Sequence, residues 1–117
     1  MSPADGCVFC RIVAGEVPAE VAAENDEAVA FHDLAPVAPL HLLIVPRAHV
    51  ADAAALTAAD GPLLGSLFAL AARVAAEQGV GEGGYRLVFN VGEDAGNTVD
   101  HLHLHLLGGR QLAWPPG

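Results

Sequence analysis

The sequence contains no lysine, and its basic residues are five arginines spread along the chain: Arg11, Arg47, Arg73, Arg86 and Arg110. With 14 acidic residues, the formal net charge at pH 7 is −9. A chain without a basic stripe is poorly suited to neutralise nucleic-acid phosphates or to attach to an anionic membrane surface. We therefore expect neither nucleic acid nor a membrane as a partner. An anionic small ligand would need a site built locally from main-chain N–H groups and histidines.

We also expect neither a leader nor a membrane span. Residues 1–6 contain neither a basic n-region nor an apolar core, and no uninterrupted apolar run reaches the roughly 18 residues that a membrane span needs. We therefore expect a cytoplasmic protein. Cysteine is scarce as well, with Cys7 and Cys10 as the two in the chain. In a reducing compartment such a pair favours metal or redox chemistry over a structural disulfide.

The length of 117 residues and a hydrophobic share of 53% indicate one globular domain over residues 1–117. Apolar periodicity and the positions of glycine and proline predict its elements. These are a short helix at 7–14, strands at 20–24, 28–32 and 40–45, a helical turn at 51–55, a long helix at 62–78, and a strand at 85–91 that forms an antiparallel hairpin with a strand at 100–106.

The stretch at 100–106, Asp-His-Leu-His-Leu-His-Leu, carries the strongest chemical signal. Its strict alternation predicts a strand with His101, His103 and His105 on one face, about 7 Å apart. Imidazoles act as bases, nucleophiles or metal ligands near neutral pH, so such a row can bracket a phosphate or hold a metal. The loop at 92–97 offers main-chain N–H groups to an anion beside this row. The plainer alternative is an amphipathic strand whose wet face happens to carry histidine.

These residues resemble a known family. The run at 101–107, His-Leu-His-Leu-His-Leu-Leu, is similar to the His-φ-His-φ-His-φ-φ motif of the histidine-triad (HIT) nucleotide hydrolases and transferases. The resemblance implies an α+β fold with a five-stranded antiparallel sheet, one long helix and a short N-terminal helix. It also implies a homodimer with a ten-stranded sheet, and hydrolysis of purine nucleoside 5'-phosphoramidates. Segments that resemble the Hint branch of this superfamily are Phe-His-Asp-Leu-Ala-Pro at 31–36, Ala-Pro-Leu-His at 38–41, Ile-Val-Pro-Arg-Ala-His at 44–49, Gly-Gly-Arg-Gln at 108–111 and Trp-Pro-Pro-Gly at 114–117.

The resemblance assigns His103 as the nucleophile that attacks the α-phosphorus, forms a nucleotidyl-histidine and expels an amine. In the family the carbonyl group matching that of His101 holds the Nδ1 proton, which leaves Nε2 nucleophilic. His105 and Thr98 would act on the phosphate and the leaving group, and His41 would support the triad. The resemblance further implies substrate-binding residues: Asp33 at the ribose, Asn90, Asn97 and Val99 near the phosphate, Val8, Phe9, Ile12, Phe31, His32 and Leu34 around the base, and Trp114.

Several of these residues have a plainer interpretation. Phe9, Phe31 and Leu34 could be ordinary core residues, and Asp33 could belong to a turn. Trp114 could cap the core of its own subunit or anchor a partner. The sequence departs from the Hint pattern at four positions: Thr98 replaces a common serine, Asn97 a glutamine, Ala113 a histidine, and Arg47, which cannot donate a proton at neutral pH, a lysine.

The Cys7-x-x-Cys10 pair allows a thioredoxin-like redox pair, a strained short-loop disulfide or a metal site. We favour zinc, which needs two further ligands. Bacterial histidine-triad proteins that resemble this chain bind zinc through two such cysteines and the histidines matching His49 and His101. The resemblance therefore implies a closed, structural Cys2His2 zinc site and no cofactor requirement for catalysis.

Two other function classes stay open. In a metalloenzyme, His101, His103 and His105 would themselves hold a catalytic zinc, but the first and third would lie about 14 Å apart on one strand, so at most two could bind one ion. A nucleotide-binding interaction protein with weak activity would carry the same site residues. Turnover of an adenosine phosphoramidate after chelation would separate these possibilities.

Overall fold

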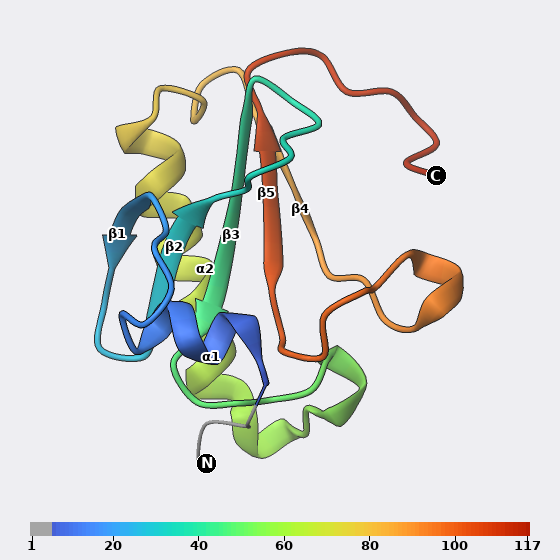
Figure 1. Ribbon diagram of the computed structural model, residues 1–117. Coiled ribbons are helices and arrows are strands. Elements are labelled where there is room, and N and C mark those ends of the chain that lie inside the picture. Colours follow the sequence, from blue (N-terminus) through green and yellow to red (C-terminus); the bar gives the residue numbers. More distant parts are fainter. Residues whose placement is uncertain (1–5) are drawn as a thin grey trace.

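The computed structural model describes residues 6–117 and contains a five-stranded antiparallel sheet with α1 on one face and α2 on the other (Figure 1). The strand order is β1-β2-β3-β5-β4, so β3 is central and β1 and β4 form the edges. This architecture confirms the predicted α+β fold. Residues 1–5, on which the expectation of no leader partly depends, lie outside the described residues. The elements are α1 (Val8–Val13), β1 (Val21–Glu24), β2 (Ala28–His32), β3 (Leu40–Pro46), α2 (Gly61–Glu77), β4 (Tyr85–Val88) and β5 (Leu104–Gly108), with 3-10 turns at Ala53–Ala55, Ala58–Asp60 and Glu93–Ala95.

Alternation along the strands divides the core into two layers. Leu42 and Ile44 of β3 pack in the layer beneath α2, whereas Leu43 and Val45 pack in the layer beneath α1. Helices cover both faces, so β3 is buried along its whole length, which explains its continuous apolar run. Since His105 of β5 pairs with Leu43, it lies on the α1 face of the sheet. The chemistry-bearing face is therefore the one that α1 covers only in part.

The long helix α2 begins after a capping box formed by Thr57 and Asp60, with Pro62 in its first turn. Its predicted bounds, 62–78, were displaced by one residue. The segment Ala58–Glu77, which contains α2, is long enough and apolar enough to match a membrane span in length and composition. One face of α2 nevertheless packs on the sheet against β1, β2, β3 and β5. A helix in the core of a soluble protein can have the same length and composition, so the match is weak evidence for a membrane span.

The strands of the histidine hairpin are shorter than predicted. The strand expected at 85–91 is β4, which ends at Val88, and the strand expected at 100–106 is β5, which begins only at Leu104. The N–H group of Leu102 instead donates to the carbonyl oxygen of Val50 at 2.6 Å. The chain before β5 thus pairs with the segment that follows β3, not with β4. The expectation that all three histidines lie on one regular strand was wrong.

The short helix α1 places both cysteines beside this region. It begins after Cys7, whose Sγ accepts a hydrogen bond from the main-chain N–H of Cys10 at 3.3 Å. Gly15 follows the helix with a φ of +77°, a conformation that favours glycine. The apolar side of α1 inserts Phe9 into the layer that also contains Phe31 of β2.

Candidate active site and metal centre

His103 is held in one tautomer by the main chain. Its Nδ1–H group donates to the carbonyl oxygen of His101 at 2.7 Å. Because a carbonyl oxygen can only accept, Nδ1 carries the proton and Nε2 keeps a lone pair. The edge of the ring packs against Phe9, with the ring centroids 5.1 Å apart. The His103 imidazole is therefore oriented as a nucleophile or base.

A second chain of hydrogen bonds fixes His41 and His105. The main-chain N–H of Val37 donates to Nδ1 of His41 at 3.2 Å, so the proton of this neutral imidazole lies on Nε2. Nε2 of His41 lies 2.9 Å from Nδ1 of His105 and donates to it. The His105 proton is therefore on Nε2, where it can be donated to a ligand. The rings of His103 and His105 lie 5.0 Å apart between centroids, closer than the predicted 7 Å.

Burial keeps these histidines neutral. Burial lowers the pKa of His41, an effect that the Asp33 carboxylate opposes. Burial is also the largest cause that lowers the pKa of His105 to about 4, and the positive charge of protonated His103 or His41 lowers it further while Asp33 opposes it. At pH 7 the neutral tautomers derived above for His41 and His105 are consequently the dominant forms.

A cavity of about 210 Å³ lies between α1, the end of β2 and the middle of β3. Leu34 is 94% exposed, which rules out the core interpretation for this residue. Phe31 is buried in the core and also lines the cavity, so its core interpretation is confirmed while its role in binding a base stays a prediction. Asp33 does belong to a turn, since its Oδ1 accepts from the N–H of Ala35 at 2.8 Å. The predicted base and ribose residues that line the cavity are Val8, Phe9, Ile12, Phe31, His32, Asp33 and Leu34.

The residues predicted near the phosphate lie on the loop between β4 and β5. Thr98 is exposed, Asn90 and Val99 are half-buried, and Val99 packs against the core beneath α1. The side-chain oxygen of Asn97 is buried and has no hydrogen-bond partner among residues 6–117. An unsatisfied buried acceptor costs about 1–3 kcal/mol. The loop therefore contains a buried polar group whose hydrogen-bonding capacity is unused.

Trp114 is not brought to this cavity. Its side chain is 81% exposed, so it does not cap the core of its own subunit. The Arg86 guanidinium of edge strand β4 lies 6.0 Å from the Trp114 ring centroid, and its Nη2 donates to the carbonyl oxygen of Ala113 at 3.0 Å. The C-terminal tail is thus held beside the edge of the sheet.

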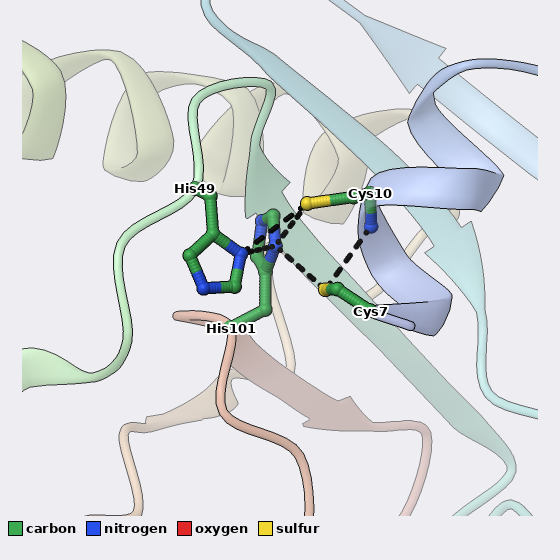
Figure 2. A group of neighbouring side chains, drawn as sticks. All are labelled: Cys7, Cys10, His49 and His101. Carbon is green, nitrogen blue, oxygen red and sulfur yellow. Dashed lines mark hydrogen bonds between the residues drawn. The ribbon is translucent and has the colours of Figure 1, made fainter. Parts of the chain in front are cut away.

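Figure 2 shows Cys7, Cys10, His49 and His101 converging from α1, the segment after β3 and the segment before β5. One ligand atom from each residue lies within 4.8 Å of all the others. Nδ1 of His101 lies 3.3 Å from Sγ of Cys7 and 3.4 Å from Sγ of Cys10. Nδ1 of His49 lies 3.2 Å from Sγ of Cys10 and from Nδ1 of His101. These four residues, here called the Cys/His cluster, could hold a metal ion.

The buried side chain of His101 is prepared as a ligand. Its Nε2–H group donates to the carbonyl oxygen of Pro46 at 2.9 Å, so Nδ1 is unprotonated and directed at the two thiols. Separations of 3.2–3.4 Å between ligand atoms are close to those around a tetrahedral ion with bonds of about 2.1–2.3 Å. The Cys/His cluster therefore fits the Cys2His2 metal site that the sequence suggested.

Comparisons with known proteins agree with this geometry. A family model described as HIT domain matches residues 14–112. The chain belongs to the HIT domain family.

Relatives of this HIT chain match it along most of its length. An uncharacterised HIT-like protein of Synechococcus elongatus is 47% identical over 110 residues, 94% of this chain and 96% of the relative. The crystal structure of a HIT family hydrolase from Legionella pneumophila is 48% identical, with a TM-score of 0.93 over 96% of this chain and all of the other. A histidine triad protein from Clostridium difficile is 35% identical, with a TM-score of 0.92 over 96% of this chain and 97% of the other.

One departure from the Hint pattern lies away from the HIT site. Nη2 of Arg47 donates to Oε1 of Glu24 at 2.6 Å and to the carbonyl oxygen of Asn25 at 2.9 Å. Arg47 therefore stabilises the turn between β1 and β2. Its inability to donate a proton at neutral pH does not bear on the histidines.

Sequence reasoning missed two main-chain groups of this HIT site. The N–H of Val37 and the carbonyl of Pro46 set the tautomers of His41 and His101, yet side-chain identity says nothing about which peptide groups face a histidine. Pro18, Ala19 and Leu43 also line the cavity and were missed. Leu43 could have been predicted, because it lies two residues after His41 on the same strand and therefore points to the same face of the sheet.

Proposed function

We propose that this HIT protein hydrolyses purine nucleoside 5'-phosphoramidates through a nucleotidyl intermediate on His103. The observation that carries this proposal is the hydrogen bond from His103 Nδ1–H to the His101 carbonyl, 2.7 Å long, near a cavity lined by mostly apolar side chains together with His32 and the Asp33 carboxylate. A fixed lone pair next to a cavity that can hold part of the substrate is what covalent catalysis at an α-phosphate requires. The Legionella relative described as a hydrolase supports the reaction class.

The chemistry has two displacements. In the first, Nε2 of His103 forms a bond to the α-phosphorus, the P–N bond of the substrate breaks, and the amine leaves after gaining a proton. In the second, water attacks phosphorus and the bond to His103 breaks, which releases the nucleoside monophosphate and restores the imidazole. Dividing one hard displacement into two easier ones lowers the barrier.

The surrounding residues would bind and orient the substrate. The base would occupy the cavity between Phe9 and Phe31, and Asp33 would accept from the ribose hydroxyls. His105 would donate its Nε2 proton to a phosphate oxygen as negative charge develops there. Thr98 and the N–H groups around Val99 would complete the phosphate site.

The Cys/His cluster would hold structural zinc. Two thiols and two imidazoles are the donor set that Zn²⁺ prefers, and a closed four-ligand site leaves no position for substrate. A cavity of about 400 Å³ is lined by Cys7 and His49, two of the four cluster residues. The two thiols also fit a reducing compartment such as the cytoplasm.

The metalloenzyme alternative needs His103 among the ligands. The described residues form two groups that could hold a metal, and neither contains His103. Phosphoramidate turnover by protein freed of metal with a chelator is the test. Turnover with an acid-labile nucleotidyl adduct supports the proposal, turnover that requires metal supports the metalloenzyme, and nucleotide binding without turnover supports an interaction protein.

The functional unit would be a two-fold dimer. Strand β4 is an unpaired edge among the described strands, and its pairing with β4 of a second copy would give a ten-stranded sheet. The exposed Trp114 beside β4 would then be covered by the partner.

A further inference from the structure

A second group of three side chains lies outside the Cys/His cluster. Asp33, His41 and His105 come from the end of β2, from β3 and from β5, and one polar atom of each lies within 4.8 Å of the others. Oδ2 of Asp33 lies 3.4 Å from Nε2 of His41, which lies 2.9 Å from Nδ1 of His105. A carboxylate and two imidazoles at these distances could hold a metal ion or relay an interaction.

The tautomer of His41 is incompatible with a metal ion bound by Asp33, His41 and His105. To bind an ion through Nε2, a neutral His41 would have to carry its proton on Nδ1, where the N–H of Val37 already points at 3.2 Å. Two donors would then face each other. The proton is instead on Nε2, between Asp33 and His105. This group is therefore a relay of two contacts: the His41–His105 hydrogen bond, and the Asp33 carboxylate 3.4 Å from the same His41 nitrogen.

The loop that carries Asp33 is built around His41. The N–H of Asp33 donates to the carbonyl of His41 at 3.0 Å, and the N–H of Val37 donates to its side chain. Oδ1 of Asp33 accepts from Ala35 at 2.8 Å, which directs Oδ2 towards His41. Nη2 of Arg110 donates to the carbonyl of Val37 at 3.1 Å and ties the loop to the end of β5. A change at Asp33 is thus transmitted to His41 through short, direct contacts.

We propose that Asp33 is a positioning residue, which through His41 holds His105 with its Nε2 proton directed at the phosphate, in addition to binding ribose. This inference rests on the proposed function for its substrate, a ribonucleoside phosphoramidate. The Asp33 carboxylate also raises the pKa of both histidines against the effect of burial, which agrees with an attractive interaction along the relay.

Ribose binding by Asp33 and positioning of His105 by Asp33 predict different effects on kcat. If Asp33 only binds hydroxyls, removing its charge and removing the substrate's 2'-hydroxyl should both weaken binding and leave kcat alone. If Asp33 also positions His105, removing its charge should lower kcat even for a substrate that lacks the hydroxyl.

Kinetics would use the full dimer with adenosine 5'-phosphoramidate and its 2'-deoxy analogue. The Asp33→Asn variant keeps an oxygen for the N–H of Ala35, and Glu77→Gln on the exposed end of α2 is the matched loss of one negative charge. For Asp33→Asn we expect kcat to fall about tenfold with both substrates. For the parent chain we expect the deoxy analogue to raise KM with little change in kcat. Glu77→Gln should behave as the parent chain does.

Nitrogen-15 NMR of the imidazoles in the ligand-free protein supplies a readout that substrate binding cannot move. The parent chain and Glu77→Gln should show Nε2–H tautomers for His41 and His105 at pH 7. In Asp33→Asn the resonance of the His41 Nε2 proton should move upfield, and His105 should populate its other tautomer. Unchanged imidazole spectra together with an unchanged kcat would overturn the proposal. If the parent chain turns over neither substrate, the proposed function fails, while the NMR comparison still decides the role of Asp33.

Discussion

The main-chain carbonyl of His101 accepts the Nδ1 proton of His103 at 2.7 Å, while the His101 side chain lies in the Cys/His cluster. One residue therefore takes part in both sites through different groups. Nε2 of His101 donates to the Pro46 carbonyl, so the ring is fixed on both sides. A well-ordered Cys/His cluster should consequently keep His103 correctly oriented. A metal ion bound there would act on the reaction only through this orientation.

The first prediction concerns the metal. Purified protein should contain close to one zinc per chain, and Cys7→Ser combined with Cys10→Ser should remove it, because the ligand set is lost. We expect the melting temperature to fall by roughly 10 °C. Some turnover should survive, since the His101 carbonyl remains. Metal analysis and calorimetry measure both. Zinc-free protein that never met a chelator would refute the site, and loss of all turnover in a folded variant would favour the metalloenzyme.

The second prediction concerns pH. His105 has its pKa lowered to about 4 from an ordinary value of 6.5. Between these values the unfolded chain binds a proton at this position and the folded chain does not, so the free energy of unfolding should decrease as pH falls from 6.5 to about 4. His105→Gln should make this decrease shallower. Urea unfolding at a series of pH values measures it, and an identical slope in the variant would contradict the pKa assignment.

The third prediction concerns Gly109, which has a φ of +90°. A Cβ added here would lie 2.9 Å from Cβ of Pro39 and in a conformation that disfavours side chains. Gly109→Ala should therefore lower the free energy of unfolding by about 1–3 kcal/mol. Gly65→Ala on the exposed side of α2, where an added Cβ meets nothing within 4 Å, is the control and should not destabilise. Equal stabilities of the two variants would contradict the steric argument.

The individual strands could be predicted from the sequence because their signals are local, whereas the five-stranded sheet was implied by the family resemblance. Alternation and apolar runs gave the strands, and Pro62 and Gly79 marked the ends of α2 to within a residue or two. The starts and ends of β4 and β5 were wrong because strand pairing is not local. The alternation at His101 and His103 continues in the sequence, but Leu102 pairs with Val50.

The histidine row illustrates the same limit at the site. In the sequence His101, His103 and His105 are equivalent members of one pattern. In the structure His101 is 0% exposed within the Cys/His cluster, whereas His103 and His105 are half-buried with opposite nitrogens protonated. The different environments come from Pro46, Val37 and other groups distant in sequence. A pattern of side chains cannot specify which peptide groups face them.

The fourth prediction is the dimer. Light scattering at micromolar concentration should give twice the chain mass, because edge strand β4 and the exposed Trp114 lie side by side. Trp114→Ala should weaken association by about tenfold or more, since exposed tryptophans at interfaces contribute much of the binding free energy. Val21→Ala at the opposite edge strand is the control. A stable monomer in the parent chain would contradict the proposal.

The last prediction concerns His103 itself. His103→Ala should lose turnover by roughly a thousandfold or more, because removing a covalent nucleophile closes a route instead of weakening a contact. Purine nucleotide binding should persist, since the base cavity is formed by α1, β2 and β3. In the parent chain, an acid-labile nucleotidyl adduct should be trapped during turnover and map to the peptide that contains His103. His105→Ala should slow adduct formation without abolishing it, because in the proposed mechanism His105 would donate to the phosphate and form no bond to phosphorus. An adduct on His105, or turnover that persists in His103→Ala, would instead indicate attack by water on a metal-bound phosphate.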